Sequence, residues 1–498
     1  MNFRESQMSI DFWTTHWSSL LLAIYYLIVF AVCCIVIYNT KSPAKASAYL
    51  LLVTFLPVAG IFVYFSFGFN YRKREIYSKK IIRDDNLLHQ VIRAINDNSI
   101  KILNENSTVF GNFDRVARMI LKNENSLVSD NNKIDLLING EQKFPRLKED
   151  LQQAKHNIHL EYYIYEDDII GNEIAAILIQ KAAEGVNVRF VYDAFGSSGI
   201  KKLAGRLRAN GVEVYPFYKI IFSLLANRVN NRNHRKIVVI DGRIGYVGGI
   251  NISDKYSNER RLENDLYWRD MSIRIEGTGV YNLQYTFLSD WNFASGQSLQ
   301  PEEAFFPAGL NRENFGDKIV QTVVSGADSK IPSIMLSMAQ CIAISRKEVF
   351  LTSPYFIPDE TILNAIKVAS LSGVDVKVLV PGISDSRIVN AASSSYYKEL
   401  LESGVEVYRY QKGFVHAKTM VCDSQLSMVG SANMDFRSFD LNFEANAIIY
   451  DPELSGVLRE QFLKDLEDAE KIDPYQWRRR SKMEKFKERL VRLAAPLM

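Results

Sequence analysis

One stretch of the sequence occurs twice with identical spacing, and it constrains the fold more than any other feature. The first copy runs from His234 to Asn251, and the second runs from His416 to Asn433. Both follow the pattern H-x-K-x4-D-x6-G-(G/S)-x-N without a slip. The chain has only six histidines, and one begins each copy. The repeat predicts two similar halves whose motifs meet at one site.

The residues after each histidine predict a β-strand, because Lys236–Ile240 and Lys418–Cys422 are rich in apolar and β-branched side chains. Successive side chains of a strand point to opposite faces, so residues two apart share a face. We therefore expect His234 and Lys236 to point the same way and Arg235 to point away. The second copy repeats this arrangement.

A turn is expected where each motif strand ends. Asp241 is followed by Gly242, a strong signal for a two-residue hairpin, and Asp423 is followed by Ser424, a weaker one. We expect both aspartates to hold the turn and orient their neighbours rather than contact a substrate.

These residue types suit reactions at phosphorus. An exposed imidazole titrates near pH ~6.5, so at pH 7 one histidine can be neutral and the other charged. A neutral histidine can attack phosphorus, and a charged one can protonate the leaving alkoxide. The lysines add positive charge where the phosphoryl oxygens gather negative charge. This set needs neither metal nor cofactor, and the asparagines can donate amide hydrogens to the same oxygens. The predicted catalytic residues are His234, Lys236, Asp241, His416, Lys418 and Asp423, with Asn251 and Asn433 binding phosphate.

The alternative is two buried hairpins with incidental histidines. It is the weaker interpretation, because buried lysines at matched positions are costly without a partner.

Two acidic residues follow the motifs and are candidates to orient the histidines. Glu444 lies 28 residues after His416, and Asp270 lies 36 residues after His234. A carboxylate that accepts a hydrogen bond from an imidazole fixes its tautomer and supports its charged form. The spacing of Asp270 departs from that of Glu444, so a surface carboxylate is the alternative for Asp270.

The composition fits a folded protein of two or more domains. Hydrophobic residues make up 47% of the chain, charged residues make up 23%, and the net charge is +3. This balance gives no general attraction to nucleic acid, for which a nuclease would carry a broad basic groove. The cysteines have no metal-ligand spacing, and we expect all of them to be reduced: Cys33, Cys34, Cys341 and Cys422.

The N-terminal region predicts a membrane hairpin. Residues 18–38 carry no charge and are long enough to cross a bilayer, and residues 46–70 form a second uncharged run that contains Pro57 and Gly60. Basic residues cluster directly after residue 70, so the positive-inside rule places the rest of the chain in the cytoplasm. A cleaved signal peptide is the alternative for the first run, but no basic segment precedes it.

Strand-like and helical segments alternate in the same order in both halves, which predicts α/β halves with largely parallel sheets. The predicted domains are a two-helix transmembrane hairpin (1–70, helices about 18–38 and 46–70), a juxtamembrane connector (71–130), a first half (131–300), a second half (301–475) and a basic amphipathic tail (476–498).

Three features outside the motifs have two interpretations each. The first half is longer than the second by 11 residues within 216–233, which form either a flap that meets lipid or a surface loop. The basic tail, 476–498, forms either a helix on an anionic membrane or a solvated helix. Tyr355 and Phe356 line an acyl or headgroup path, although core packing is equally possible for Phe356.

The duplicated motif resembles that of the HKD phospholipase D superfamily. The N-terminal run from Pro43 to Asn70, the segment from Gly185 to Asp193 and Trp477 with its basic tail resemble the bacterial cardiolipin synthases. The resemblance implies two tandem phospholipase D-like α/β/α halves related by a pseudo-twofold duplication. It also implies an acidic residue that orients each histidine.

The resemblance further implies a reaction that joins two phosphatidylglycerol molecules and releases glycerol. It assigns His234 as nucleophile and His416 as general acid and then base, although the order could be reversed. It implies an integral protein of the bacterial inner membrane with a cytoplasmic catalytic part, and contacts with anionic lipids rather than nucleic acid. One chain supplies both motifs, so an oligomer is not required. The alternatives are a membrane-anchored hydrolase, a phosphatidyltransferase with another acceptor, a nuclease and an inactive scaffold, of which the intact motifs argue against the last.

Overall fold

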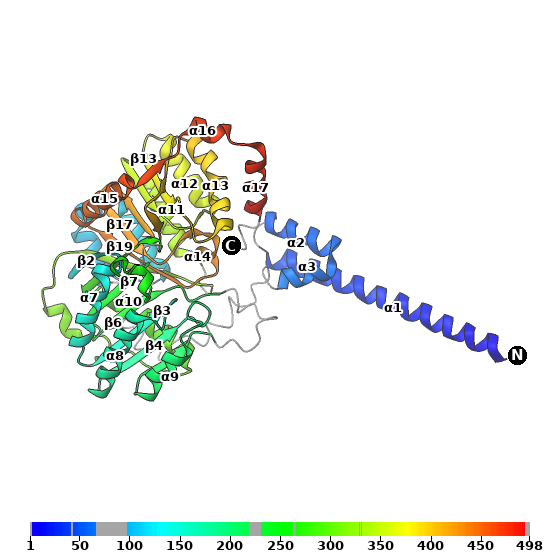
Figure 1. Cartoon of the computed structure of the whole chain (residues 1–498), viewed down its shortest axis with the longest axis horizontal. Helices are drawn as coiled ribbons and strands as arrows, with labels where there is room; N and C mark the ends of the chain where they lie inside the picture. Colours follow the sequence, from blue (N-terminus) through cyan, green and yellow to red (C-terminus); the bar gives the residue numbers. More distant parts are fainter. Residues whose placement is uncertain are drawn as a thin grey trace. The chain divides into compact units, whose positions relative to one another are not determined.

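The computed structural model describes residues 2–40, 43–65, 97–124, 126–218, 231–261, 265–327, 329 and 331–493. The chain divides into two compact units (Figure 1): an N-terminal unit, Met1–Arg74 with Ile220–Asn230, and a large unit, Glu75–Lys219 with Asn231–Met498. Residues 66–70 of the expected second membrane helix and residues 219–230 of the expected flap lie outside the described residues.

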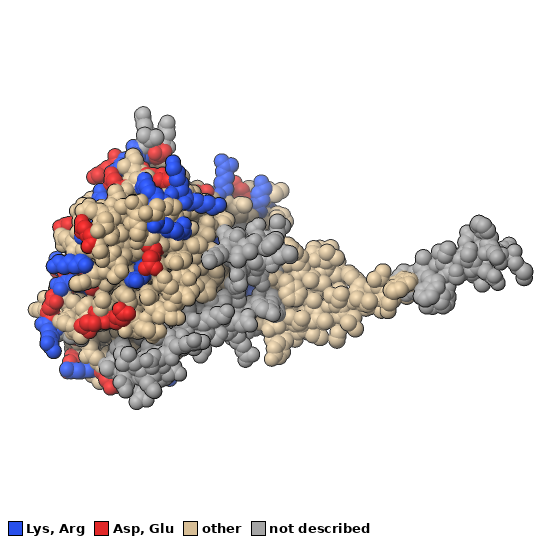
Figure 2. Space-filling view, turned by 90° about the horizontal axis from the view of Figure 1, so that it is seen from below, with Lys and Arg blue, Asp and Glu red and all other residues tan. Residues whose placement is uncertain are grey.

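The N-terminal unit is built on one long helix, α1 (Asn2–Asn39). Its segment Ser19–Asn39 is long and apolar enough to cross a membrane, and among the described residues it is the one helix that meets this test. Leu27 and Phe30 of this segment are each 70% exposed. Figure 2 draws the described residues of this unit almost wholly in tan, the colour of uncharged residues. Such a surface suits the hydrocarbon of a bilayer.

The second apolar run does not form the single helix that we expected over residues 46–70. It forms α2 (Pro43–Phe55), breaks at Leu56, whose φ of −132° and ψ of 64° are not helical, and continues as α3 (Pro57–Val63). Proline lacks an N–H and disfavours helical geometry in the residue before it. The 13 residues of α2 span roughly 20 Å, less than the ~30 Å of a hydrocarbon core. A two-helix hairpin is therefore not confirmed.

The large unit contains one large sheet in each half. The first sheet has the strand order β2-β9-β7-β6-β3-β4-β5, and the second has the order β1-β10-β19-β17-β16-β11-β13-β14-β20. The first comprises β2 (Asn132–Ile138), β3 (Asn157–Tyr162), β4 (Asn187–Tyr192), β5 (Glu213–Pro216), β6 (Lys236–Ile240), β7 (Ile244–Gly248) and β9 (Met271–Gly277). The second comprises β1 (Val128–Ser129), β10 (Ile319–Ser325), β11 (Glu348–Thr352), β13 (Asp375–Pro381), β14 (Glu406–Tyr410), β16 (Thr419–Cys422), β17 (Leu426–Gly430), β19 (Glu444–Tyr450) and β20 (Ala469–Lys471).

The expectation of largely parallel sheets is wrong. Only β3, β4 and β5 run parallel in the first sheet, and only β11, β13 and β14 do so in the second. The motif strands β6 and β16 pair antiparallel with their neighbours on both sides. The cause on one side of each motif strand is local: a tight turn that begins at the motif aspartate joins β6 to β7 and β16 to β17, and a tight turn reverses the chain direction.

The sheets pack inner face to inner face, with helices on the outside. Alternate residues of the motif strands, such as Ile237 and Val421, share one core between the sheets with α10 (Val280–Ser295) and α15 (Pro452–Glu467). The helices α7 (Asn139–Gln153), α8 (Ile169–Ala183) and α9 (Lys201–Ala209) cover the outer face of the first sheet. The helices α11 (Ser333–Ile344), α12 (Glu360–Leu371) and α13 (Arg387–Glu402) cover that of the second (Figure 1).

The described part of the expected connector packs with the second half. The short helix α5 (Ser107–Phe110), the turn η2 (Gly111–Phe113) and the helix α6 (Asp114–Glu124) bury Phe110, Val116 and Ile120 in its outer core. The strand β1 then joins β10 at the edge of the second sheet. This segment is therefore part of the scaffold of the second half.

The C-terminal tail forms two helices, α16 (Pro474–Arg479) and α17 (Lys482–Leu493). Trp477 is buried against Tyr397, and the guanidinium of Arg480 lies 3.3 Å from the centre of the Trp477 ring. An ion pair of 2.6 Å between Arg492 and Glu399 ties α17 to α13. The tail is thus docked on the second half.

Candidate active site

Each motif lysine lies beside its own histidine, as the strand alternation predicts. Lys236 begins β6, and its Nζ donates a hydrogen bond to the carbonyl oxygen of His234 at 2.6 Å. Lys418 immediately precedes β16 and donates in the same way to the carbonyl oxygen of His416. Both lysines are buried. Arg235 faces the other side of the strand, where it forms an ion pair with Asp290.

Each histidine is held by a carboxylate from the other half. The Nδ1 atom of His234, from the first half, lies 3.0 Å from a carboxylate oxygen of Glu444, from the second. The Nδ1 atom of His416, from the second half, lies 2.6 Å from Asp270 Oδ2, from the first. This exchange brings both motifs into one cluster. Because each carboxylate accepts a hydrogen bond from Nδ1–H, Nε2 is the ring nitrogen of a neutral imidazole that keeps its lone pair.

Backbone hydrogen bonds across the halves place the histidines. The N–H of His234 donates to the carbonyl oxygen of Phe443, the residue before Glu444, at 2.9 Å. The N–H of His416 donates to that of Arg269, the residue before Asp270, at 2.7 Å. Near His416, β8 (Tyr267–Arg269) also pairs with β15 (Gly413–Val415). Each backbone hydrogen bond therefore places a histidine of one half next to the carboxylate of the other half that holds its ring.

Burial keeps both imidazoles neutral in the free site. It lowers the pKa of His234 to about 4, although the Glu444 carboxylate acts in the opposite direction. It lowers the pKa of His416 to about 3, and Lys418 lowers it further while Asp270 raises it. The sequence suggested one neutral and one charged histidine at pH 7, because exposed rings were assumed.

The two carboxylates stay ionised although they are buried. Burial alone would raise the pKa of Asp270, but Lys418 and His416 hold it below its ordinary value. Burial would likewise raise the pKa of Glu444, but His234 and Lys236 lower it. The site therefore keeps two anions next to its two imidazoles.

The motif lysines lose part of their basicity to burial. Burial lowers the pKa of Lys418 to about 8, although Asp270 and Glu444 oppose this effect. Burial also lowers the pKa of Lys236 well below its ordinary value. An anion that enters the site stabilises the charged form of both lysines.

The motif aspartates lie at the far end of the strands from the histidines. Asp241 sits in the turn after β6, and its carboxylate accepts the backbone N–H groups of Lys155, His156 and Asn157. Asp423 accepts those of residues 346–348 in the same way. Each aspartate therefore fixes the start of the neighbouring strand, β3 for Asp241 and β11 for Asp423. The structure therefore places both aspartates at the turns, away from the histidines, where we expected them to hold the turn.

The two motif asparagines differ in their contacts. The amide oxygen of Asn251 accepts the N–H of Ile164 at 3.1 Å, and its Nδ2 donates to the hydroxyl of Tyr256 at 2.6 Å. Asn433 is 4% exposed, and its amide oxygen has no hydrogen-bond partner among the described residues. The repeat predicted equivalent roles, but only the second asparagine keeps a free amide oxygen.

A third lysine is buried at the site in addition to the two motif lysines. Lys143, on α7, donates a hydrogen bond of 2.6 Å to the carbonyl oxygen of Ile250, the residue before Asn251. Burial lowers its pKa to about 7 although Asp270 acts in the opposite direction. Lys143 lies 91 positions before the first motif in a polar helix, so no sequence signal marks it.

Aromatic side chains surround the histidines unequally. The ring of Tyr163 lies 4.7 Å from that of His234. His416 is surrounded by Trp268, Phe414 and Tyr256, with ring centres 5.4, 5.6 and 5.7 Å away. Of the residues singled out from the sequence, Phe356 packs in the core, and the partly exposed Tyr355 contacts Phe414.

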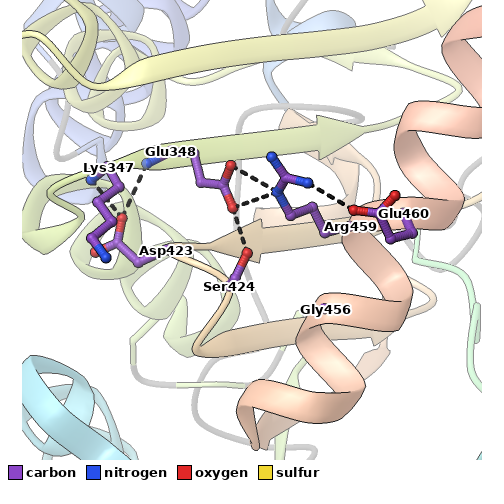
Figure 3. A pocket seen from close by; sticks show the side chains of 7 residues that line it. All are labelled: Lys347, Glu348, Asp423, Ser424, Gly456, Arg459 and Glu460. Atoms are coloured by element: carbon purple, nitrogen blue, oxygen red, sulfur yellow. Dashed lines mark hydrogen bonds and ion pairs between the residues drawn. The ribbon is translucent and has the colours of Figure 1, made fainter.

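A separate surface pocket of about 480 Å³ lies at the turn end of the second motif strand (Figure 3). Figure 3 shows the carboxylate of Glu348 accepting from Arg459 and Ser424, and Arg459 extending to Glu460. Because carboxylates neutralise Arg459, the pocket offers an anion little attraction. Among the described residues, no group of three or more His, Cys, Asp or Glu side chains could hold a metal ion.

The family described as cardiolipin synthase, PLD-like domain, matches residues 147–291 and 338–466, which include both motif histidines. Cardiolipin synthase 2 of Bacillus anthracis is 38% identical over 473 residues, which cover 94% of this chain and 90% of that protein. The chain belongs to this family. A cardiolipin synthase of Listeria innocua is 38% identical over 486 residues and is covered over 99% of its length.

The fold of the family is also seen in a solved structure. The phosphatidylserine synthase of Haemophilus influenzae matches with a TM-score of 0.58 at 14% identity, covering 77% of this chain and 99% of that one. At this identity the likeness concerns the fold alone. It supports an α/β fold with two repeated regions.

Proposed function

We propose that this chain is a cardiolipin synthase, which transfers a phosphatidyl group from one phosphatidylglycerol to a second and releases glycerol. The names of its relatives support the activity. One observation carries the mechanism: each motif histidine is held by a carboxylate of the other half, so both imidazoles belong to one charged cluster.

In the first step, the lone pair on Nε2 of His234 attacks the phosphorus of the first lipid. The bond between phosphorus and the glycerol oxygen breaks, and His416 gives the Nε2 proton to that oxygen. Glycerol leaves, and the phosphatidyl group stays on His234 through a P–N bond. Because an anion beside an imidazole raises its pKa, the bound phosphodiester lets His416, which is neutral in the free site, take up a proton from solvent before this transfer.

In the second step, the terminal hydroxyl of the second phosphatidylglycerol gives its proton to His416 and attacks the same phosphorus. The P–N bond breaks, its electron pair returns to His234, and cardiolipin leaves. Lys236, Lys418 and the amide groups of Asn251 and Asn433 bind the phosphoryl oxygens in both steps. Glu444 and Asp270 orient the histidines. One chain supplies every group, so the chemistry requires no second copy.

The N-terminal unit holds the enzyme at its substrate. The exposed apolar segment Ser19–Asn39 anchors the chain in the bacterial inner membrane. The basic residues after position 70 favour a cytoplasmic catalytic part, and α2 and α3 complete a second membrane-associated element. The helix α17 contacts anionic lipid at the surface. Anchoring favours a lipid hydroxyl over water as the acceptor, because both lipids are confined to the same bilayer.

Lipid analysis tests the proposal. The chain is expressed in bacterial cells that lack cardiolipin, next to His234→Ala and His416→Ala variants. We expect cardiolipin from the unsubstituted chain and from neither variant, with equal protein amounts in the membrane fraction. Phosphatidic acid alone would make the chain a hydrolase, and a phosphatidyl ester of another alcohol would make it a transferase with a different acceptor.

A further inference from the structure

The two halves differ beside the motif asparagines. After each asparagine, the backbone pairs with the segment that leads to the next helix: Ile252 pairs with Tyr165, and Met434 pairs with Phe356 in the two-stranded sheet of β12 (Phe356–Ile357) and β18 (Met434–Asp435). Ile164 and Tyr355 therefore occupy equivalent positions. The first half therefore has an apolar residue, Ile164, at the position where the second half has the phenol of Tyr355.

The phenol of Tyr355 holds a carboxylate at the edge of the site. Its hydroxyl donates to Asp385 Oδ2 at 2.6 Å, and the side chain of Asp385 is exposed. The Ser353 hydroxyl fixes this segment, because it donates to the carbonyl oxygen of Tyr355 at 2.9 Å and accepts the N–H of Met434 at 3.0 Å.

This pair lies on the His416 side of the site. The Tyr355 ring lies 6.4 Å from that of Phe414, which in turn lies 5.6 Å from that of His416. The charge of Asp385 acts on Lys418 and raises its pKa, against the lowering by burial. Asp385 therefore lies at the edge of the cluster of side chains around the second motif, with Tyr355 and Phe414 between it and His416.

An anionic side chain at this position has a cost, because it repels the phosphodiester of the substrate. A ligand that donates a hydrogen bond to the Asp385 carboxylate offsets this cost. The second motif contains another group that needs a hydrogen-bond donor. The buried amide oxygen of Asn433 has no partner among the described residues, and an unsatisfied buried acceptor is unfavourable. A general base for one hydroxyl, with acceptors near it for a second, matches an alcohol with two hydroxyls.

We infer that Asp385, Tyr355 and the amide oxygen of Asn433 form the acceptor-alcohol subsite, which selects a vicinal diol over water and monohydric alcohols. The inference rests on the proposed function. The terminal hydroxyl of the headgroup faces His416 and reacts, while the neighbouring secondary hydroxyl donates to the Asp385 carboxylate. Water lacks the second hydroxyl, so it is held less well. The first half has Ile164 at the equivalent position and carries no such pair.

Two small alcohols that differ by one hydroxyl test the subsite. The full chain is reconstituted in vesicles of labelled phosphatidylglycerol with equal concentrations of 1,2-propanediol and 1-propanol. The ratio of the two phosphatidyl alcohols reports how the phosphatidyl-histidine intermediate divides between the two acceptors. We expect a preference for the diol of about tenfold in the unsubstituted chain, because a hydrogen bond to a charged group is a strong one.

Asp385→Asn and Tyr355→Phe should bring the ratio of the two phosphatidyl alcohols close to one and raise the share of phosphatidic acid. The total consumption of labelled lipid should fall by a smaller factor than this ratio does. Asp317→Asn, with the same charge change at a side chain that is 90% exposed, should leave the ratio unchanged. A ratio that survives both subsite variants, or no preference in the unsubstituted chain, would overturn the subsite while cardiolipin synthesis stands. A chain that makes no cardiolipin would overturn the proposed function and the subsite with it.

Discussion

At the scale of single residues, each carboxylate holds the histidine of the other half: Glu444 holds His234, and Asp270 holds His416. Glu444→Gln removes the anion beside His234 and leaves the Asp270 contact of His416 intact. We expect the ¹⁵N resonances of the His234 ring to move and those of His416 to stay, with Asp270→Asn giving the reverse. Synthesis should fall by about 10²–10⁴-fold in both variants, the range for a lost acid–base function. Glu453→Gln, at an exposed side chain, is the matched control.

A second prediction at this scale concerns pH. In the free site, burial lowers the pKa of Lys418 to about 8, so the lysine is charged below this pH and neutral above it. An anion binds the charged form. Dimethyl phosphate carries one negative charge across this range, and above about pH 8 it should lose the attraction of the Lys418 charge. Its inhibition constant should then rise by up to tenfold per pH unit. An inhibition constant that stays level to pH 10 would contradict the lowered pKa.

Part of this site was predictable from local pattern alone. Strand alternation places His234 and Lys236 together, and the turn signal places Asp241 away from them. The partner of each carboxylate was not predictable, because Glu444 lies 210 residues after His234, and only the packing of the halves joins them. The lowered pKa values of the histidines come from burial, which an isolated motif does not report.

At the scale of elements, the junction of β8 and β15 positions His416 and Asp270 together. A Cβ on Gly413 would lie 2.1 Å from the carbonyl oxygen of Tyr267, so the two strands approach closely only with glycine there. Gly413→Ala should therefore part the strands, lower the thermal unfolding midpoint and reduce synthesis at least tenfold.

Gly205→Ala is the matched control, because a Cβ at Gly205, in the helix α9, meets nothing within 4 Å. Alanine there should stabilise the protein by about 0.5–1 kcal/mol and leave synthesis unchanged. Equal behaviour of the two variants would show that the β8–β15 junction does not support the site.

The helices and strands around the motifs follow their sequence signals closely. Residues 360–372 have the sequence pattern of a helix and form α12, Glu360–Leu371, and the residues from 373 have the pattern of a strand and form β13, Asp375–Pro381. Strand direction was mispredicted, because alternation of strands and helices describes β3, β4 and β5 but not the hairpins after the motifs. The break at Leu56 depends on one proline, whose effect inside an apolar run differs between membrane and soluble helices.

At the scale of the whole molecule, both halves contribute residues to a single cluster of histidines, lysines and carboxylates. The sequence repeat made the shared site predictable. The number of membrane crossings was harder to predict from the sequence, because the second apolar run has the composition of a membrane helix but forms α2 and α3. The tail was predicted as a basic amphipathic helix, and its docking through Trp477 on α13 required the fold.

The last prediction concerns the lipid contact of α17. The helix has five basic and two acidic residues, and its apolar residues Met483, Phe486 and Leu490 are 57–63% exposed although α17 is docked on α13. An apolar stripe beside cations suits the surface of an anionic membrane, where each lysine or arginine contributes about 1 kcal/mol. Phe486→Trp in the full chain should therefore add tryptophan fluorescence that brominated phosphatidylglycerol quenches.

Electrostatic attraction makes this contact depend on lipid charge. We expect weaker quenching of the added signal in brominated phosphatidylcholine, and weaker quenching in phosphatidylglycerol as salt rises, because salt screens exposed charges. Val457→Trp, at a side chain of α15 that is 53% exposed, supplies the control outside the stripe and should escape quenching in both lipids. Equal quenching at positions 486 and 457 would mean that α17 has no preferred contact with the bilayer, and its exposed apolar residues would then need a protein partner.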